Sequence, residues 1–324
     1  MKTMFRATII VSGLLLLGGC AAHFHLDFLG SENLEEVSLV PSPAKEKILV
    51  LDIEGLISSL AMPGMLSREG DILSQVYARL EKASADPLVR GIILRLDTPG
   101  GEVTASDIVY HELIKFRENT GRPVVGLMMS TAASGGYYIA QACDHVIAHS
   151  STITGSIGVI SIFPSAEGLL SKIGVKVNVI KSGEMKDAGS TFREMTSEDR
   201  KVFQGIIDEL YQNFLDVISK NRERSLSKEE LRAVADGRVY TAPQALRLKL
   251  IDEIGYFDSA LKKVLALASL KQAKVIAYSY YPKRKTNLYA ASLAAPSLFD
   301  NKTLDKYLPS LKTGFYYLWI PEAR

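Results

Sequence analysis

The stretch GIILRLDTPGG, residues 91–101, places an apolar run directly before a polar segment that ends in two glycines. Apolar runs also occupy residues 48–51 and 123–128, and helix-like amphipathic segments lie at residues 71–83 and 106–116. Short apolar runs that alternate with amphipathic segments are typical of βαβ units. The pattern therefore predicts an α/β fold, with a parallel sheet whose faces are covered by helices.

Two distinctive loops follow strands of this predicted sheet. Residues 97–101 follow one apolar strand, and residues 130–136 follow the next strand along the chain. Functional sites on parallel sheets lie at the carboxyl ends of the strands. We therefore expect the two loops to be neighbours in space and to form the site.

Ser134 lies in the second loop, and two glycines and a helix-like run at residues 137–142 follow it. A serine at a strand-to-helix turn exposes its hydroxyl at the positive end of a helix dipole, and the next backbone N–H can stabilise an oxyanion. The same arrangement also makes a good N-cap and turn. Ser134 is thus a candidate nucleophile that needs a base to support it.

Histidine is the usual base for a serine nucleophile. His23 and His25 lie in an irregular N-terminal segment, and His111 lies in a helix-like stretch. His145 and His149 flank a short apolar run. We interpret both as structural, although His149 could reach the end of a strand, so a Ser-His pair remains an open alternative.

Lysine is the other base known for serine nucleophiles, when its ammonium is desolvated enough to lose its proton. A strand-like run at residues 175–180 leads into a glycine-containing loop that carries Lys186. Most lysines are solvated at the surface. The residue pattern alone therefore does not select Lys186.

Two further elements are predicted beyond this loop. A long amphipathic helix should run from residue 197 to 220, with Thr196 as its N-cap and Asp199 close to the acidic position of a capping box. A strand candidate lies at residues 274–280, and the irregular tail after it contains a basic cluster at residues 282–285. Such clusters are usually solvated, and we assign no role to this one.

The N-terminus is typical of a secretion signal. Lys2 and Arg6 precede an apolar stretch that ends in Leu17-Gly18-Gly19-Cys20 and is too short to span a bilayer. Small residues before a cysteine fit the lipobox at which bacterial lipoproteins are cut and acylated, so Cys20 should carry a lipid. An uncleaved anchor helix is the alternative, and both interpretations place the body of the chain outside the cytoplasm.

Composition excludes several classes of function. The chain has 324 residues, with 38 basic and 36 acidic side chains, so nothing in its charge suggests a nucleic-acid partner. The only cysteine besides Cys20 is Cys143, which lies in an apolar run and should be a buried structural thiol. Neither metal-ligand spacing nor a phosphate-binding glycine loop occurs, so we expect no metal and no cofactor.

Six motifs between about residues 47 and 265 occur in an order that matches a known family. They are Thr98–Gly101, Ala132–Tyr138, Thr154–Val159, Lys181–Gly183 with Lys186-Asp187, Arg193–Thr196 and Ala235–Tyr240. Together they resemble the signal peptide peptidase A family. The resemblance implies a ClpP/crotonase-like fold and a serine protease with a Ser-Lys dyad, in which Ser134 is the nucleophile and Lys186 is the general base.

The same resemblance implies roles for three more residues. Ser156 matches the serine that orients the lysine amine by a hydrogen bond. Gly101 matches a backbone donor of the oxyanion hole, and Gly135, next to the nucleophile, is the natural second donor. Lys186 would take the Ser134 proton and pass it to the leaving amine.

The expected organisation has four parts. Residues 1–19 are a lipoprotein signal peptide, residues 20–45 are the lipidated Cys20 and a tether, residues 46–270 are the protease domain, and residues 271–324 are a C-terminal extension. Members of the family commonly have a transmembrane anchor, whereas here a lipid would hold the chain to the membrane. Ala21 is not the aspartate associated with inner-membrane retention, which favours the outer membrane in a Gram-negative cell.

The resemblance also implies a substrate class and an assembly. We expect an endopeptidase of the cell envelope that degrades cleaved signal peptides and other short apolar or misfolded polypeptides. Short members of the family assemble as rings with sites shared between protomers, so we expect a ring-shaped homo-oligomer. The alternatives are a catalytically dispensable envelope scaffold and a crotonase-like acyl-CoA enzyme.

Overall fold

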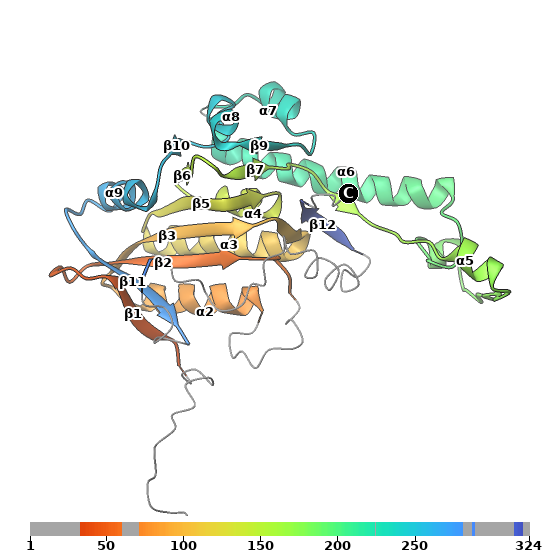
Figure 1. Ribbon diagram of the computed structural model, residues 1–324, viewed down its shortest axis with the longest axis horizontal. Helices are drawn as coiled ribbons and strands as arrows, with labels where there is room; N and C mark the ends of the chain where they lie inside the picture. The colour runs from red at the N-terminus through yellow and green to blue at the C-terminus, as the bar shows by residue number, and fades with distance from the viewer. Residues whose placement is uncertain (1–32, 60–70, 224, 281–286, 289–313, 320–324) are drawn as a thin grey trace, which may run out of the picture.

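The computed structural model describes most of the chain, and Figure 1 shows its elements. The described residues are 33–59, 71–223, 225–280, 287–288 and 314–319. The predicted signal peptide, Cys20, His23, His25 and the basic cluster at residues 282–285 lie outside them.

A nine-stranded, largely parallel sheet forms the centre of the described part of the chain. Its main order is β1-β11-β2-β3-β5-β6-β10, and β7 and β9 extend it beside β5. The strands are β1 (Glu35–Val40), β2 (Lys47–Glu54), β3 (Val89–Thr98), β5 (Val124–Ala133), β6 (His145–Ala148), β7 (Ile153–Gly155), β9 (Val239–Thr241), β10 (Glu253–Ile254) and β11 (Lys274–Ser279). Only the β1–β11 and β7–β9 pairs in this sheet are antiparallel.

Helices cover both faces of the sheet (Figure 1). The α-helices in the described ranges are α2 (Ile72–Ala85), α3 (Val103–Thr120), α4 (Gly135–Ala140), α5 (Glu167–Lys172), α6 (Ser197–Arg222), α7 (Lys228–Val234), α8 (Ala242–Arg247) and α9 (Phe257–Leu267). No helix in the described ranges is long and apolar enough to cross a membrane.

Strand β2 shows why the central strands are continuous apolar runs. Leu49 and Leu51 belong to the core that includes α2 and α3, whereas Ile48 and Val50 belong to the core that includes α9. Successive side chains point to opposite faces, and both faces are buried here. Burial of each such side chain contributes about 2 kcal/mol relative to exposure. The predicted α/β fold with a helix-covered parallel sheet is confirmed.

Two predicted helix starts are also confirmed. Asp71 caps α2 and accepts a hydrogen bond from the Ser74 N–H at 3.0 Å. Thr196 caps α6, and Asp199 completes the capping box. Each cap pairs backbone N–H groups that would otherwise lack a partner at the first turn of a helix.

The strand predicted at residues 175–180 is wrong. These residues are irregular in the structure, and Ile180 is fully exposed. They belong to an arm, residues 162–196, that carries α5 away from the sheet (Figure 1). None of the side chains in this arm, which is described throughout, is buried. The alternating valines have the composition of a strand, but no strand of the described chain pairs with them.

Strands also occur in segments where none was expected, and β1 and β12 (Phe315–Leu318) are two of them. Residues 35–40, placed in the tether by their irregular composition, form β1 because β11 offers them an antiparallel partner. Near the C-terminus, β12 joins β4 (Gly100–Glu102) and β8 (Ile160–Ser161) in a second, three-stranded sheet. Both pairings join segments far apart in the sequence, which local patterns do not reveal.

Candidate active site

The turn that carries Ser134 has a strained backbone. Ser134 follows the last residue of β5 and precedes α4, with φ 53° and ψ −112°. Positive φ is rare for a residue with a side chain, and strain of this kind is concentrated at functional sites. The Ser134 N–H donates to the Gly155 carbonyl at 2.7 Å, and the Ser134 carbonyl accepts from the Tyr138 N–H at 2.8 Å. These two bonds hold the strained turn in place.

Small residues around the turn are required by the packing. A Cβ on Gly135 would lie 2.4 Å from Ser106 Oγ, and a Cβ on Gly136 would lie 2.6 Å from Thr98 Cγ2. Both distances are far below van der Waals contact, so the two glycines let α4 begin directly against β3 and α3. The Ser-Gly-Gly sequence is therefore explained by close packing as well as by chemistry.

Gly101 and Gly135 lie close together, as predicted for the two oxyanion donors. The Gly101 N lies 3.2 Å from the position that a Cβ on Gly135 would take. On the other side of Gly101, the Ile57 N–H donates to the Gly100 carbonyl at 2.9 Å and the Glu102 N–H donates to the Ile57 carbonyl at 2.8 Å. Since backbone groups alternate along a strand, the Gly101 N–H faces away from Ile57. Ile57 was missed by sequence reasoning, because nothing local marks it as the partner of β4.

Ser156 lies beside the Ser134 turn. Strands β5 and β7 pair in register at Ala133 and Gly155, so Ser134 and Ser156 are the next residues on neighbouring parallel strands. Ser156 also has positive φ, 50°, and its N–H donates to the Arg238 carbonyl at 2.8 Å. The structure therefore brings Ser134, Ser156 and the two glycines together.

Lys186 is not part of this cluster within the chain. It lies in a short 3-10 helix, Glu184–Asp187, on the exposed arm, and its side chain is exposed. Ser134 is 1% exposed, and its Oγ has no hydrogen-bond partner among the described residues. The nucleophile and the predicted base thus lie apart, and the base for Ser134 is missing from its own turn.

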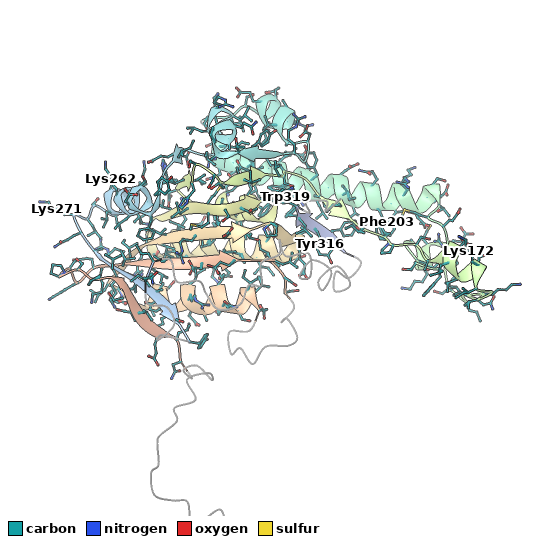
Figure 2. All side chains as sticks on the ribbon, in the orientation of Figure 1. Lys172, Phe203, Lys262, Lys271, Tyr316 and Trp319 are labelled. Atoms are coloured by element: carbon teal, nitrogen blue, oxygen red, sulfur yellow. The ribbon has the colours of Figure 1, made fainter. Side chains whose placement is uncertain are left out.

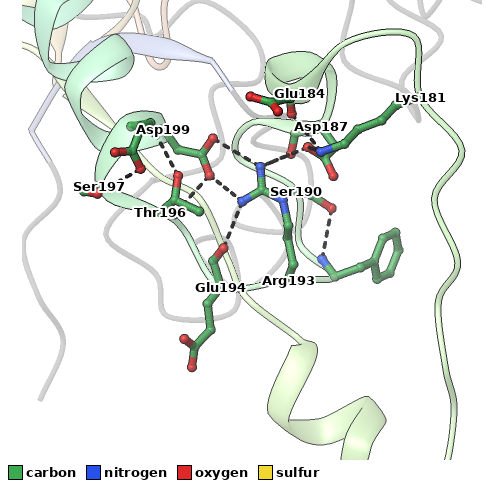
Figure 3. A network of polar contacts seen from close by, with 11 residues as sticks. Lys181, Glu184, Asp187, Ser190, Arg193, Glu194, Thr196, Ser197 and Asp199 are labelled. Carbon is green, nitrogen blue, oxygen red and sulfur yellow. Dashed lines mark hydrogen bonds and ion pairs between the residues drawn. The ribbon is translucent and has the colours of Figure 1, made fainter.

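An ion-pair network fixes the segment that carries Lys186, as Figure 3 shows. Asp187 accepts from Lys181 Nζ at 2.8 Å and from Arg193 Nη2 at 3.0 Å, and Arg193 also pairs with Asp199 at the start of α6. Arg193 and then Lys181 hold the pKa of Asp187 well below its usual range. Arg193 lowers the pKa of Asp199 to about 2. Both carboxylates stay ionised near neutral pH, so the network ties Lys186 to α6.

The two histidines at the ends of β6, His145 and His149, do not supply the missing base. His145 Nε2 lies 3.3 Å from a Glu253 carboxylate oxygen, and His149 packs against the Tyr256 ring with centroids 4.9 Å apart. His149 Nε2 is buried without a hydrogen-bond partner in the described chain, and burial lowers the pKa of this imidazole. Neither ring makes a hydrogen bond with Ser134 Oγ, which has no partner among the residues that the structure describes. The geometry does not support the Ser-His alternative.

Cys143 is buried, as expected for a structural thiol. Burial raises its pKa to about 12, so the thiol stays protonated at neutral pH. A protonated, inaccessible thiol is not a nucleophile. Among the groups of this part of the fold, Ser134 is therefore the candidate nucleophile that the geometry favours.

Comparison with known proteins shows the family of the chain. The model of peptidase family S49 matches residues 117–271, a span that includes both Ser134 and Lys186. An Enterococcus faecium protein named "Putative signal peptide peptidase SppA" is 34% identical over 265 residues, which cover 82% of this chain and 75% of that protein. The chain belongs to peptidase family S49. The resemblance found in the sequence is confirmed.

Other relatives of this S49 peptidase differ in length. Protease 4 of Haemophilus influenzae is 36% identical over 229 residues, which cover 70% of this chain but 35% of that protein. The chloroplastic serine protease SPPA of Arabidopsis thaliana is 29% identical over 247 residues, which cover 76% of this chain and 35% of the relative. The chain therefore spans about a third of these two relatives. Membership in family S49 makes it a serine protease, signal peptide peptidase-like, and argues against the acyl-CoA alternative.

Proposed function

We propose that this S49 protease is an endopeptidase with a Ser-Lys dyad on a ClpP/crotonase-like fold. The observation that carries the proposal is the strained Ser134 turn beside Gly101 and Gly135. An activated hydroxyl and two backbone N–H groups at one point are what acyl transfer from a peptide carbonyl requires. No metal or organic cofactor takes part in the proposed reaction.

The proposed reaction has two halves. Lys186, as a neutral amine, takes the Ser134 proton while Oγ bonds to the peptide carbonyl carbon, and the N–H groups of Gly101 and Gly135 stabilise the oxyanion. The C–N bond then breaks as the lysine protonates the leaving amine, which gives an acyl-enzyme. Water hydrolyses the ester and returns the proton to Ser134. In this proposal Ser156, which lies beside the nucleophile, orients the lysine amine.

We propose further that Lys186 reaches Ser134 from a neighbouring copy in a ring-shaped homo-oligomer. Three observations support this assembly. Ser134 lacks a base in its own turn, the arm extends from the sheet (Figure 2, where Lys172 lies near its tip), and the arm exposes Val175, Val179 and Ile180. Phe163 at the base of the arm packs on Phe203 of α6 with ring centroids 4.3 Å apart, which gives the arm a fixed root.

The proposed substrates are cleaved signal peptides and other short apolar or misfolded chains of the cell envelope. The names of the relatives and the sequence of the N-terminus support this class. The test is to offer the full chain, purified in detergent, a signal-peptide-like apolar peptide and a long-chain acyl-CoA, and to identify products by mass spectrometry. Cleavage of internal peptide bonds alone is expected. Thioester hydrolysis without peptide cleavage would instead support the acyl-CoA enzyme, and no product from either would favour the scaffold.

The membrane anchor is proposed to be a lipid on Cys20, which lies outside the described residues. Replacing Cys20 with alanine should release the protein from membranes, because a stable anchor of this kind depends on the acyl chains. The measurement is the share of protein that sediments with membranes, with Cys143→Ala as the matched control because that thiol is buried. Tight membrane binding of the Cys20→Ala protein would show that the apolar segment itself is the anchor.

A further inference from the structure

Strands β3 and β5 depart from a simple register just before the candidate site. From Leu96 to Thr98, β3 advances two residues, whereas β5 advances four residues between the partners of these positions, Met128 and Ala132. The extra residues of β5 form a bulge, and bulges are common next to active sites, where they redirect the chain. The bulge ends directly before the turn that carries Ser134, so the contacts that hold the bulge also position the nucleophile.

The bulge sets the level of Ser134 relative to β3. The register before the bulge, if it continued, would place Ser134 opposite Glu102, whereas the register after the bulge places it opposite Gly100. This difference is about 7 Å along a strand. The packing agrees, because a Cβ on Gly100 would lie 2.7 Å from the Gly135 N and 3.1 Å from the Ala133 carbonyl oxygen. The bulge therefore brings the nucleophile level with the candidate oxyanion donors.

Asp97 lies on β3 at the position that faces the bulge. Its Oδ1 accepts a hydrogen bond from the Thr131 N–H, within the bulge, at 3.0 Å. The Asp97 carbonyl accepts from the Gly55 N–H at 3.0 Å, which fixes the Asp97 backbone against the end of β2. A bulge interrupts the regular ladder of backbone hydrogen bonds, and buried N–H groups need an acceptor. The Asp97 side chain thus supplies the bond that regular pairing with β3 would have given.

Two threonine hydroxyls hold the other side of the bulge. The Thr152 hydroxyl donates to the Met128 carbonyl at 3.1 Å, and the Thr154 hydroxyl donates to the Ala132 carbonyl at 2.7 Å. Both threonines are fully buried. They tie the bulge to the segment that forms β7, whereas Asp97 ties it to β3, the strand that leads to the candidate oxyanion donor.

The path from Asp97 to that donor is short and buried. Thr98 follows Asp97, is fully buried, and accepts a hydrogen bond from the Gly100 N–H on its Oγ1 at 3.0 Å. Gly100 has φ 100°, which glycine adopts without strain, and Gly101 comes next. A shift of Asp97 relative to the bulge would therefore change the position of the Gly101 N–H relative to the nucleophile.

The bond to Thr131 requires an acceptor oxygen rather than a negative charge. Burial raises the pKa of Asp97, and the hydrogen bond from the Thr131 N–H opposes this rise. A carboxyl group keeps an acceptor oxygen in both of its protonation states, and an asparagine amide has an acceptor oxygen at the same distance from the backbone. Asparagine at this position can therefore keep the bond. Glutamate keeps the charge but moves the oxygen, and alanine removes it.

We propose that Asp97 is a positioning residue of this protease, whose carboxyl oxygen holds the bulge of β5 so that Ser134 Oγ and the Gly101 N–H reach the same peptide carbonyl. This inference rests on the proposed endopeptidase function. In this role Asp97 does not contact the substrate, and it acts through Thr131 and the serine turn. A misplacement of reacting groups by about 1 Å can lower a rate by about a hundredfold.

The test compares four variants of the full chain in detergent, with a signal-peptide-like apolar peptide as substrate. Asp97→Ala and Asp97→Glu should each lower kcat by about tenfold to a hundredfold and change KM by less than about twofold, because the alignment matters most in the transition state. Asp97→Asn should keep most of the kcat. Asp144→Ala is the matched control, because Asp144 Oδ2 accepts from the Val124 N–H at 2.9 Å at the opposite end of β5. It should lower the melting temperature without lowering kcat.

Hydrogen exchange provides a measurement that does not depend on turnover. Asp97→Ala should speed exchange of the amides of residues 129–133 and leave those of residues 124–127 unchanged, and Asp144→Ala should have the reverse effect. Because Asp97→Glu keeps the charge of the native side chain, it serves as the decisive variant if Asp97→Ala does not fold.

Several outcomes would overturn the proposal. Normal kcat in Asp97→Glu, or equal losses of kcat in Asp97→Ala and Asp144→Ala, would mean that Asp97 does not align the site. An Asp97→Asn protein as slow as Asp97→Ala would mean that the acceptor oxygen is not what matters. If the unmodified chain cleaves no peptide, the proposed function is overturned, and the exchange of residues 129–133 still decides whether Asp97 holds the bulge.

Discussion

Ser134→Ala and Lys186→Ala should each reduce peptide hydrolysis by at least about a thousandfold, because each removes one partner of a nucleophile and base that act together. Neither change should alter the fold, since Lys186 is exposed and Ser134 Oγ makes no hydrogen bond in the described chain. Mixing the two inactive proteins should then restore activity. The reason is that the Ser134→Ala chain still has its lysine, and the Lys186→Ala chain still has its serine.

The size of the recovery is itself informative. If subunits mix at random in a ring, about a quarter of the sites combine an intact serine with an intact lysine from the neighbour. Lys172→Ala is the matched control, because Lys172 is an exposed lysine of α5 on the same arm. Variants that co-assemble without regaining activity would show that the dyad forms within one chain. Activity in Lys186→Ala alone would mean that another group is the base.

Gly101→Ala should lower kcat by about a hundredfold to a thousandfold, which is the usual cost of losing one oxyanion donor. A Cβ on Gly101 would lie 1.9 Å from the Ile57 carbonyl oxygen, and this contact is with backbone rather than with a flexible side chain. Strand β4 must therefore move, and the Gly101 N–H moves with it. The measurement is kcat and KM for one peptide, together with the melting temperature.

Gly205→Ala provides the control for this prediction. Gly205 lies in α6, and nothing lies within 4 Å of the Cβ that alanine would add there. Alanine also favours a helix over glycine by about 1 kcal/mol, so this protein should be fully active and no less stable. If the Gly101→Ala protein keeps its fold and a near-normal kcat, the Gly101 N–H is not a donor of the oxyanion hole.

The central part of the fold was predictable because its signals are local. Strands β2, β3 and β5 are apolar runs that are buried on both faces, and α6 begins with a capping box that the sequence displays. The Ser134 turn was also visible, as a serine before two glycines at the end of a strand. These features depend on residues that are neighbours in the chain.

The structural features that the sequence could not predict depend on contacts between residues that are far apart in the sequence. The valines of residues 175–179 have strand composition, yet no described strand pairs with them, whereas Phe315–Leu318 forms a strand because β4 and β8 receive it. Lys186 was selected as the general base because the sequence resembles a known family. In the structure of one chain it does not lie beside Ser134. Hydrophobic pattern and secondary-structure propensity describe neighbouring residues, so they cannot identify a pairing partner that is distant in the sequence.

The Arg238 and Gly155 contacts at the serine turn also bear on when the site can form during synthesis. Ser134 is held by Gly155, and the next residue on that strand, Ser156, is held in turn by the Arg238 carbonyl of the segment that enters β9. Because a chain is synthesised from its N-terminus, Ser134 is present well before Arg238 has been added. The serine turn therefore matures late, after most of the polypeptide has been made, and a half-made chain lacks the contacts that hold Ser134 and Ser156 in place.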